Sequence, residues 1–405
     1  MVRYVAMIKQ LFCALVLVAA PAFITVAVAD AAQADSVFIP IQDHQKVDQQ
    51  AAIIRARQLI ASGDLDGAVS ELADFVNSHP DAVDAARFLG DLYYRQGHFD
   101  RAESVYRALL ARNGHDKETH NRLGVVYATE NRVDDAIGEF QSALPGTDSI
   151  RDLVLMHVRK GDLPSYESEM VRAAKDQPSD PDTQEELGEI YQALHQPSEA
   201  ILYFQRALDD DPQSIAALNG LGMAYLDMHA PSLASRYLQD CLNLDPLNYA
   251  CLDNMGVSRI QATKYGDALE SFVRAHRLEP ERPEALVNFG YLADLRGDWK
   301  RAVSFYVQAI AVDPYVPESY VNLGIDYEHN DLYNLAQAAL LKGVAATPWD
   351  GRVRYLLARA YAAQGQKTLA LAQLKAAQAS LDPDVAAIAK EETARLTATS
   401  MPSAP

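Results

Sequence analysis

The chain of 405 residues carries 55 acidic and 36 basic side chains, which gives a formal net charge of −19. This excess of negative charge repels a polyanion and no long run of Lys or Arg offsets it, so we do not expect a nucleic-acid partner. A chain of this length would ordinarily form two or three globular domains, unless internal repetition organises it.

The N-terminal residues have the composition of an export signal. Arg3 and Lys9 precede a continuous apolar run, residues 11–29, and small residues alternate at its end. We therefore expect residues 1–34 to be a signal peptide, residues 35–48 to be a linker, and the rest of the chain to be periplasmic in a bacterial cell. Because the apolar run is longer than the core of most signals, an uncleaved anchor stays open as an alternative.

Beyond the linker, a unit of 34 residues recurs. In the unit that begins at Pro283, small residues occupy positions 8 (Gly290), 20 (Ala302) and 27 (Ala309), and Pro314 occupies position 32. The same template fits units that begin at Gln49, Val83, Pro181, Ile215, Tyr249, Pro317 and Gly351. Two antiparallel helices approach closely where both offer small side chains, and Pro ends the second helix. Each unit is therefore predicted to be a helical hairpin.

Bulky residues accompany the small ones. Position 11 is usually Tyr, as at Tyr225 and Tyr327, and position 24 is also large. With the period of 34, this pattern resembles the tetratricopeptide repeat (TPR) family. The resemblance implies an all-α superhelical solenoid of about ten helix-turn-helix repeats over residues 49–383, in which each hairpin buries its apolar face against its neighbours. We expect a capping helix at 384–396 and a disordered tail at 397–405.

Two units depart from the template. The unit from Lys117 is four residues shorter, and the unit from Thr147 has Val154 and Tyr166 at two of the small-residue positions. The stretch 147–180 is therefore a degenerate repeat, and the pattern leaves open whether it is a hinge, a docking surface or the result of drift.

Cys241 and Cys251 are the cysteines outside the predicted signal, and they lie on consecutive helices of two adjoining repeats. A disulfide between them would form in an oxidising compartment. Alternatively, both are buried as small apolar residues. The spacing does not decide between these alternatives, because it does not give the distance between the two Cα atoms.

No motif for catalysis or cofactor binding stands out. The ten histidines show no HExxH or other metal-ligand spacing. Gly220-Leu221-Gly222 resembles part of a nucleotide fingerprint but lacks its third glycine and a preceding strand. The sequence therefore predicts a protein that is not an enzyme, with no cofactor, no metal site and no small-molecule substrate.

The resemblance also implies a binding surface. In this family the first helix of each repeat lines a concave groove, and positions 2, 5, 9, 12 and 13 are expected to face it. Between Pro181 and Asp350 these positions hold nine acidic residues and no Lys or Arg, and three successive repeats have Asn at position 6. The predicted groove comprises Asp182, Glu185, Glu189, Met223, Asp227, Asp253, Asn254, Val257, Glu284, Asn288, Tyr291, Asp294, Asn322, Ile325 and Glu328.

Two interpretations of the groove stay open. It would hold a basic, partly apolar segment of a partner protein, with the three Asn side chains bonding the main chain of that segment. Alternatively, its acids only favour helix N-termini and form a solvated face. The repeats nearer the two ends carry arginines at the same inward positions: Arg57, Arg87, Arg95, Arg151, Arg159, Arg352 and Arg359.

These features indicate a non-catalytic scaffold for protein partners, similar to TPR proteins that assemble pili, secretion machines or polysaccharide exporters at the bacterial envelope. Peripheral association with the envelope membrane stays open. One alternative is an assembly factor for exported redox proteins. Another is a glycan-binding protein in which Tyr94, Tyr291 and Tyr355 stack on sugars.

Overall fold

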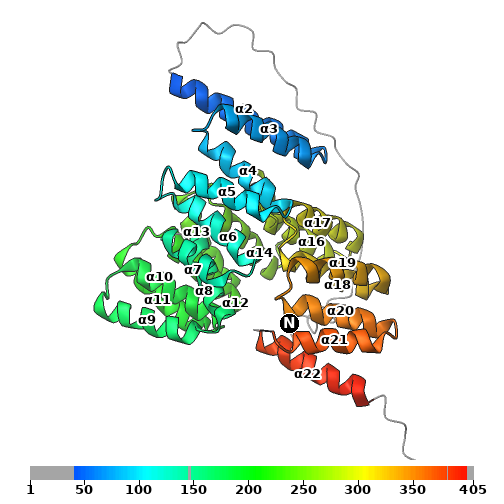
Figure 1. Cartoon of the computed structure of the whole chain (residues 1–405). Coiled ribbons are helices and arrows are strands. Elements are labelled where there is room, and N and C mark those ends of the chain that lie inside the picture. The colour runs from blue at the N-terminus through cyan, green and yellow to red at the C-terminus, as the bar shows by residue number, and fades with distance from the viewer. Residues whose placement is uncertain (1–40, 145–146, 381, 399–405) are drawn as a thin grey trace, which may run out of the picture.

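The computed structural model describes residues 41–144, 147–380 and 382–398, and in these residues the chain forms 21 α-helices and no strand. The predicted signal peptide lies outside the described residues, as does the tail from residue 399 onward. The helices alternate in antiparallel pairs that stack along a superhelix (Figure 1). The prediction of an all-α repeat solenoid is confirmed.

Ten hairpins, numbered repeats 1 to 10 here, make up the array. Their first helices are α2 (Ile41–Ala61), α4 (Val83–Arg95), α6 (Lys117–Thr129), α8 (Thr147–Lys160), α10 (Pro181–Ala193), α12 (Ile215–Asp227), α14 (Tyr249–Gln261), α16 (Glu284–Leu295), α18 (Pro317–His329) and α20 (Gly351–Ala363). Their second helices are α3 (Leu65–Ser78), α5 (Phe99–Leu110), α7 (Val133–Ser142), α9 (Leu163–Asp176), α11 (Pro197–Asp210), α13 (Pro231–Leu244), α15 (Tyr265–Leu278), α17 (Trp299–Val312), α19 (Tyr333–Ala346) and α21 (Lys367–Ala377).

The ends of the array differ slightly from the predicted boundaries. Helix α2 begins at Ile41, so the prediction that residues 41–48 belong to a linker is wrong. Helix α22 (Pro383–Ala398) packs against α20 and α21 at the place of the predicted cap and extends two residues into the predicted tail. Among the described helices, none combines the length and the apolar character that crossing a membrane requires.

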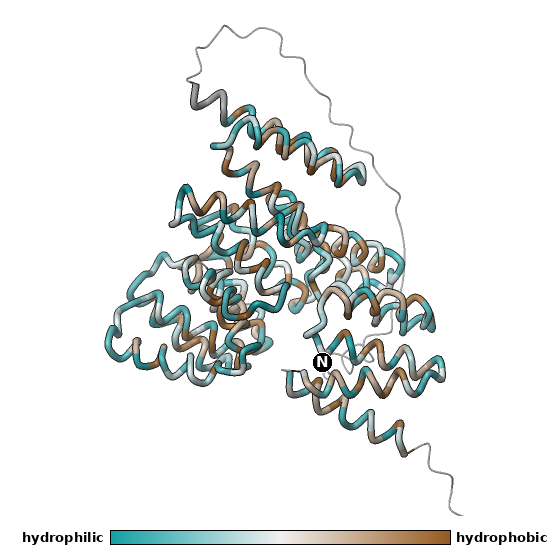
Figure 2. The backbone as a smooth tube through the Cα atoms, in the orientation of Figure 1, coloured by the Kyte–Doolittle hydropathy of each residue, from teal (hydrophilic) through white to brown (hydrophobic). Residues whose placement is uncertain are grey.

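Close crossing of the two helices depends on the small residues of the template. A Cβ atom placed on Gly290 would lie 2.4 Å from Cε1 of Tyr306, the bulky residue at position 24 of the same repeat. Gly256 and Phe272 have the same relation one repeat earlier. The apolar side chains therefore meet between paired helices, where the hydrophobic residues concentrate (Figure 2).

Each hairpin turns at a residue with a left-handed backbone, always at position 15 of the repeat. Glycine takes this place in five repeats, and Asn131, His195, His229, Thr263 and Asp331 take it in the others with φ between 55° and 62°. The sequence pattern did not single out this position. His195 and His229 lie in turns because they occupy position 15, where a residue with a left-handed backbone lets the chain reverse after the first helix.

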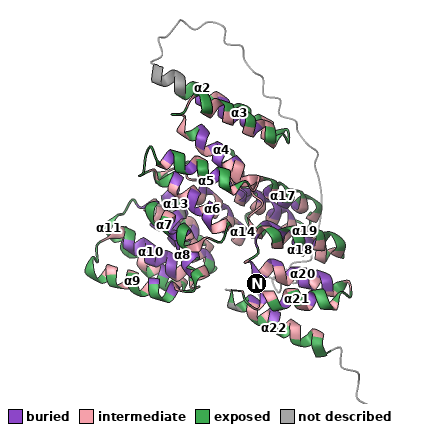
Figure 3. Cartoon of the chain, viewed as in Figure 1, coloured by how far each residue is buried: buried purple, intermediate pink, exposed green. Residues whose placement is uncertain are grey.

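First helices form the inner side of the superhelix. Neighbouring first helices contact one another, as α10 does with α12 and α12 with α14, whereas a second helix contacts its own first helix and the next one. Helix α10 has an unbroken buried stretch from Thr183 to Ile190, while α11 buries only Ala200, Phe204 and Ala207 (Figure 3). The inner layer is therefore enclosed on more sides than the outer layer.

The degenerate repeat keeps its hairpin. Tyr166, which replaces the small residue at position 20, stacks on His157 with ring centroids 3.9 Å apart. Nδ1 of His157 in turn lies 2.8 Å from Oδ1 of Asp162 in the turn. The aromatic pair fills the crossing that small residues make elsewhere.

A glycine-to-alanine substitution tests the crossing. We expect Gly290→Ala to lower the free energy of unfolding by about 1–3 kcal/mol, because the new methyl group overlaps the ring of Tyr306. A methyl group added to Gly138 in α7 would meet no atom within 4 Å, so Gly138→Ala should instead raise stability by about 0.5–1 kcal/mol. Urea unfolding followed by circular dichroism measures both changes. Equal effects of the two substitutions would contradict this account.

Candidate partner-binding groove

The predicted groove residues lie on α10, α12, α14, α16 and α18, the first helices of repeats 5 to 9. Asp182 and Asp227 are exposed, whereas Glu185 and Glu189 are 7% and 5% exposed. The other predicted residues are half-buried. The groove is therefore much less open to solvent than the pattern of polar side chains implied.

Neighbouring repeats are joined on this inner side by hydrogen bonds between residues 35 positions apart. Because the repeat is 34 residues long, position n of one repeat meets position n + 1 of the next. The bond from Gln49 Nε2 to Asp84 Oδ2 is 2.8 Å long, and the bond from Gln261 Nε2 to the carbonyl of Leu226 is 3.0 Å long. The stagger recurs in the pairs Tyr94–Thr129, Gln192–Asp227, Asn219–Asn254, Tyr249–Glu284 and Asp253–Asn288.

Two of the three predicted ladder asparagines take part in this stagger. Nδ2 of Asn254 donates to Oδ1 of Asn219 over 2.8 Å, and Nδ2 of Asn288 donates to both carboxylate oxygens of Asp253 over 2.8 and 2.9 Å. These amide groups bond the preceding repeat. Bonding of Asn254, Asn288 and Asn322 to the main chain of a partner stays a prediction.

Several groove acids have pKa values far above the ordinary range. Burial raises the pKa of Asp253 to about 7, although the bonds from Asn288 act against this rise. Burial also raises the pKa of Glu185 to about 7, against the effect of the Ser214 hydroxyl. Glu186, which the sequence pattern did not assign to the groove, reaches a pKa of about 7 through burial alone. Near neutral pH the groove therefore carries less negative charge than its composition suggests.

Asp294 and Asp326 form a carboxyl pair between repeats 8 and 9. Burial raises the pKa of both residues, and the hydrogen bond between them means that the pair retains a proton at neutral pH. The hydroxyl of Tyr306 donates to Oδ2 of Asp294 over 2.7 Å, which ties the pair to the ring at the helix crossing. Asp326 was not predicted, because position 10 is not among the inward positions of the template.

An apolar row follows position 9 of the central repeats. It consists of Met223, Val257, Tyr291 and Ile325, one from each of four successive repeats, and each is half-buried. The exposed carboxylates of Asp182 and Asp227 lie on the neighbouring first helix α10 and on α12. These four apolar residues and the two exposed acids are the part of the predicted groove that can still serve an outside partner.

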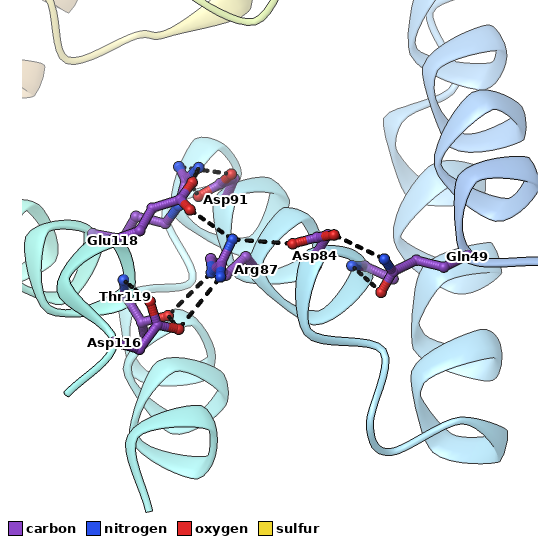
Figure 4. Close-up of polar contacts among 9 residues, drawn as sticks. Gln49, Asp84, Arg87, Asp91, Asp116, Glu118 and Thr119 are labelled. Atoms are coloured by element: carbon purple, nitrogen blue, oxygen red, sulfur yellow. Dashed lines mark hydrogen bonds and ion pairs between the residues drawn. The ribbon is translucent and has the colours of Figure 1, made fainter. Parts of the chain in front are cut away.

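The inward arginines are all engaged within the chain. Arg87 lies among three acids: its Nη1 is 2.7 Å from Glu118 and 3.2 Å from Asp84, and its Nη2 is 3.4 Å from Asp116 (Figure 4). Arg352 and Arg359 pair with Glu318 and Glu328 of the preceding repeat. Nη2 of Arg151 lies 3.3 Å from the sulfur of Met223, and its Nε lies 3.7 Å from Glu189.

Three of these arginines reach across a full turn of the superhelix. Arg57 pairs with Glu281, Nη2 of Arg95 donates to the carbonyl of Ala311 over 3.1 Å, and the guanidinium of Arg159 lies 4.5 Å from the centre of the Trp349 ring. Repeats 1 and 4 thus contact the connections that follow repeats 7 and 9, and repeat 2 contacts the end of α17 in repeat 8. We call this set of contacts the closure seam. Sequence reasoning missed it, because no local signal links residues that are so far apart along the chain.

Cys241 and Cys251 are joined in a disulfide, with their Cα atoms 6.4 Å apart. Both cysteines are completely buried, and the bond links the end of α13 to the start of α14. Among the residues that the structure describes, no group of three or more His, Cys, Asp or Glu side chains could hold a metal ion.

A family model described as "Tetratricopeptide repeat" matches residues 55–97, 89–149, 169–234 and 254–317, which together are more than half of the chain. The chain belongs to the tetratricopeptide repeat family. TPR proteins generally mediate protein–protein interactions, typically as non-catalytic scaffolds, and we expect partners of this TPR protein to be proteins.

Among solved structures, the TPR chain is similar to yeast Tom70 with 12% identity and a TM-score of 0.47, over 88% of this chain and 96% of that chain. It is also similar to a tetratricopeptide repeat protein from Parabacteroides merdae with 19% identity and a TM-score of 0.46, over 62% of this chain and 98% of that chain. Likenesses at this level carry no functional argument. No curated protein matches the chain.

The raised pKa of Asp253 predicts a pH-dependent stability. The folded-state pKa of about 7 exceeds the ordinary value of 3.8. The free energy of unfolding therefore falls as the pH rises from about 4 to 7, because the unfolded chain gives up the proton of this carboxyl while the folded chain still holds it. Asp253→Asn keeps the bond with Asn288 and copies the Asn219–Asn254 pair of the preceding repeat. At pH 8 we expect this variant to be more stable than the parent by on the order of 2–4 kcal/mol, with the gain shrinking toward pH 4.

Urea unfolding at several pH values between about 4.5 and 8 measures this difference. The exposed Asp240, on the outer helix α13, supplies the control Asp240→Asn, which should match the parent throughout. A gain for Asp253→Asn that stays constant over this pH range would show that ionisation of Asp253 is not its cause.

Proposed function

We propose that this TPR protein is a non-catalytic scaffold of the bacterial envelope that holds a segment of a partner protein along the inner side of repeats 5 to 9. The segment is partly apolar and carries basic residues. Its apolar side chains pack on the row formed by Met223, Val257, Tyr291 and Ile325, and its cations face Asp182 and Asp227. Assembly of a pilus, a secretion machine or a polysaccharide exporter is the kind of process that such a scaffold serves.

The apolar row is the observation that carries this proposal. A partner segment gains binding free energy from apolar surface that is still partly in contact with water, and the four row residues are half-buried rather than buried. The groove polar groups that bond the next repeat contribute little, because a partner would have to replace bonds that are already made. Exposed acids on the inner helices α10 and α12 favour a basic segment over an acidic one.

The disulfide supports export of the chain. Disulfides persist in oxidising compartments such as the bacterial periplasm and are rare in the cytosol. Cys241 and Cys251 are bonded, and the apolar N-terminal run in the sequence has the composition of an export signal. Both features support a periplasmic location of the scaffold.

Two of the three tyrosines that the glycan-binding alternative requires are engaged in contacts within the chain. Tyr94 packs against Tyr315 and bonds Thr129, and the guanidinium of Arg359 lies 5.7 Å from the centre of the Tyr355 ring. Rings that are engaged in this way do not offer a flat face to a sugar. A protein segment is therefore the partner that the groove fits better.

Neutralising the two exposed acids tests the groove. The principal partner is first captured from an envelope extract with the parent protein. We expect the double variant Asp182→Asn/Asp227→Asn to bind this partner about tenfold more weakly or worse, because two exposed carboxylates no longer attract its cations. The matched control is Asp209→Asn/Asp240→Asn on the outer helices α11 and α13, which changes the net charge equally. Equal capture by both double variants would show that the groove is not the binding surface.

Localisation can be tested with the full chain in a bacterial host. We expect the protein in the fraction released by osmotic shock, with Cys241 and Cys251 unreactive toward a thiol reagent until a reductant is added under denaturing conditions. Retention inside spheroplasts, with both thiols free, would contradict export.

A further inference from the structure

Tyr315, in the connection between α17 and α18, adds an aromatic contact to the closure seam. Its ring lies 5.0 Å from the Tyr94 ring and 5.3 Å from the Phe99 ring, measured between centroids. Its hydroxyl lies over Gly97, where a Cβ atom would be only 3.0 Å away. The turn between α4 and α5 in repeat 2 thus receives an aromatic side chain from the connection after repeat 8.

Charged groups surround this aromatic contact. Arg95, next to Tyr94, donates to the carbonyl of Ala311, and burial lowers the pKa of its guanidinium. Burial raises the pKa of Asp313 to about 6, and Arg95 acts against this rise. Oδ1 of Asp313 accepts a 2.8 Å bond from the backbone N–H of Tyr315, which fixes the connection.

The closed arrangement is incompletely satisfied. Nε of Arg95 is buried without an acceptor among the described residues. A buried donor without an acceptor costs free energy that it recovers on contact with water. The seam also consists of side-chain contacts between connections and helix ends, whereas each hairpin buries a continuous apolar face. Separation of the seam therefore disrupts far less structure than separation of a hairpin does.

The seam lies on the inner side of the array. Arg57, Arg95 and Arg159 occupy inward positions on α2, α4 and α8. Their contacts link α2 and α8 to the connections before α16 and α20, and link α4 to the last turn of α17. Figure 1 shows α4 and α5 beside α16 and α17, as these contacts require. These contacts join one turn of the superhelix to the next along its inner side.

We propose that the contact of Tyr315 and Ala311 with Tyr94, Arg95 and Phe99 is a latch that keeps the superhelix closed and limits access to the groove of repeats 5 to 9. When the latch opens, repeats 1 and 2 move away from repeats 8 and 9 as rigid hairpins, and a partner segment can enter. The gating part of this proposal rests on the proposed function, whereas the closure itself does not.

Distances between spin labels in the full chain test the latch without any partner. Labels are attached at Asp100→Cys on α5 and Val307→Cys on α17, both exposed, with Cys13→Ser in every variant. The native pair Cys241–Cys251 is buried and bonded, so it takes no label. We expect a single narrow distance in the parent and a longer, broader distribution in Tyr315→Ala, at unchanged helical content.

Tyr333→Ala is the matched control, because the Tyr333 hydroxyl bonds the nearby Asp331 and the residue lies outside the seam. It should keep the narrow distance of the parent. A distribution in Tyr315→Ala that equals that of Tyr333→Ala overturns the latch.

Partner capture separates the latch from the proposed function. We expect Tyr315→Ala to capture the groove partner several-fold faster than the parent does, and Asp182→Asn/Asp227→Asn to lose capture at an unchanged label distance. A longer distance with an unchanged capture rate overturns the gating. A longer distance together with equal capture by the groove variant and its control supports closure by the latch and counts against the proposed function.

Discussion

The contact between the residue at position 8, usually glycine, and the bulky side chain at position 24 governs the rest of this structure. The absence of a side chain at Gly290 lets the Tyr306 ring lie directly against the first helix, which brings the two helices of a repeat close together. Each hairpin then presents the same shape to the next one, so a small rotation is repeated along the chain. Since first helices contact one another on the inner side and second helices lie outside, the repeated rotation winds the array into a superhelix.

Winding places the polar side chains of the first helices against the next repeat. The stagger of 35 residues lets Asn288 bond Asp253 and Asn254 bond Asn219, so these groups stabilise the stack. Burial in the same layer keeps protons on Asp253 and on the Asp294–Asp326 pair by raising their pKa, because a buried carboxylate without a cation is costly. A groove that looks strongly acidic in composition is therefore closer to neutral, and its apolar row gains importance for binding.

Curvature also brings the two halves of the chain together. Repeats 1, 2 and 4 contact the connections after repeats 7, 8 and 9. There Arg57 forms an ion pair with Glu281, and the Tyr94 ring packs against the Tyr315 ring. Such contacts add little to the stability of individual hairpins, because they involve few side chains at helix ends. They do control the width of the superhelix, and with it the surface that a partner can reach.

The sequence by itself determined the period, the hairpins, the family and the inward face of each first helix, because all of these depend on contacts between residues at most one repeat apart. Gly290, Ala302 and Pro314 predict their hairpin without knowledge of any other repeat. Spacing within adjoining repeats also suggested Cys241 and Cys251 as a candidate pair. Only the tertiary structure decided which polar groups face water, which carboxyls keep their protons, and that Tyr315 meets Tyr94. Those outcomes depend on the rotation between repeats, which accumulates over a whole superhelical turn and leaves no local pattern in the sequence.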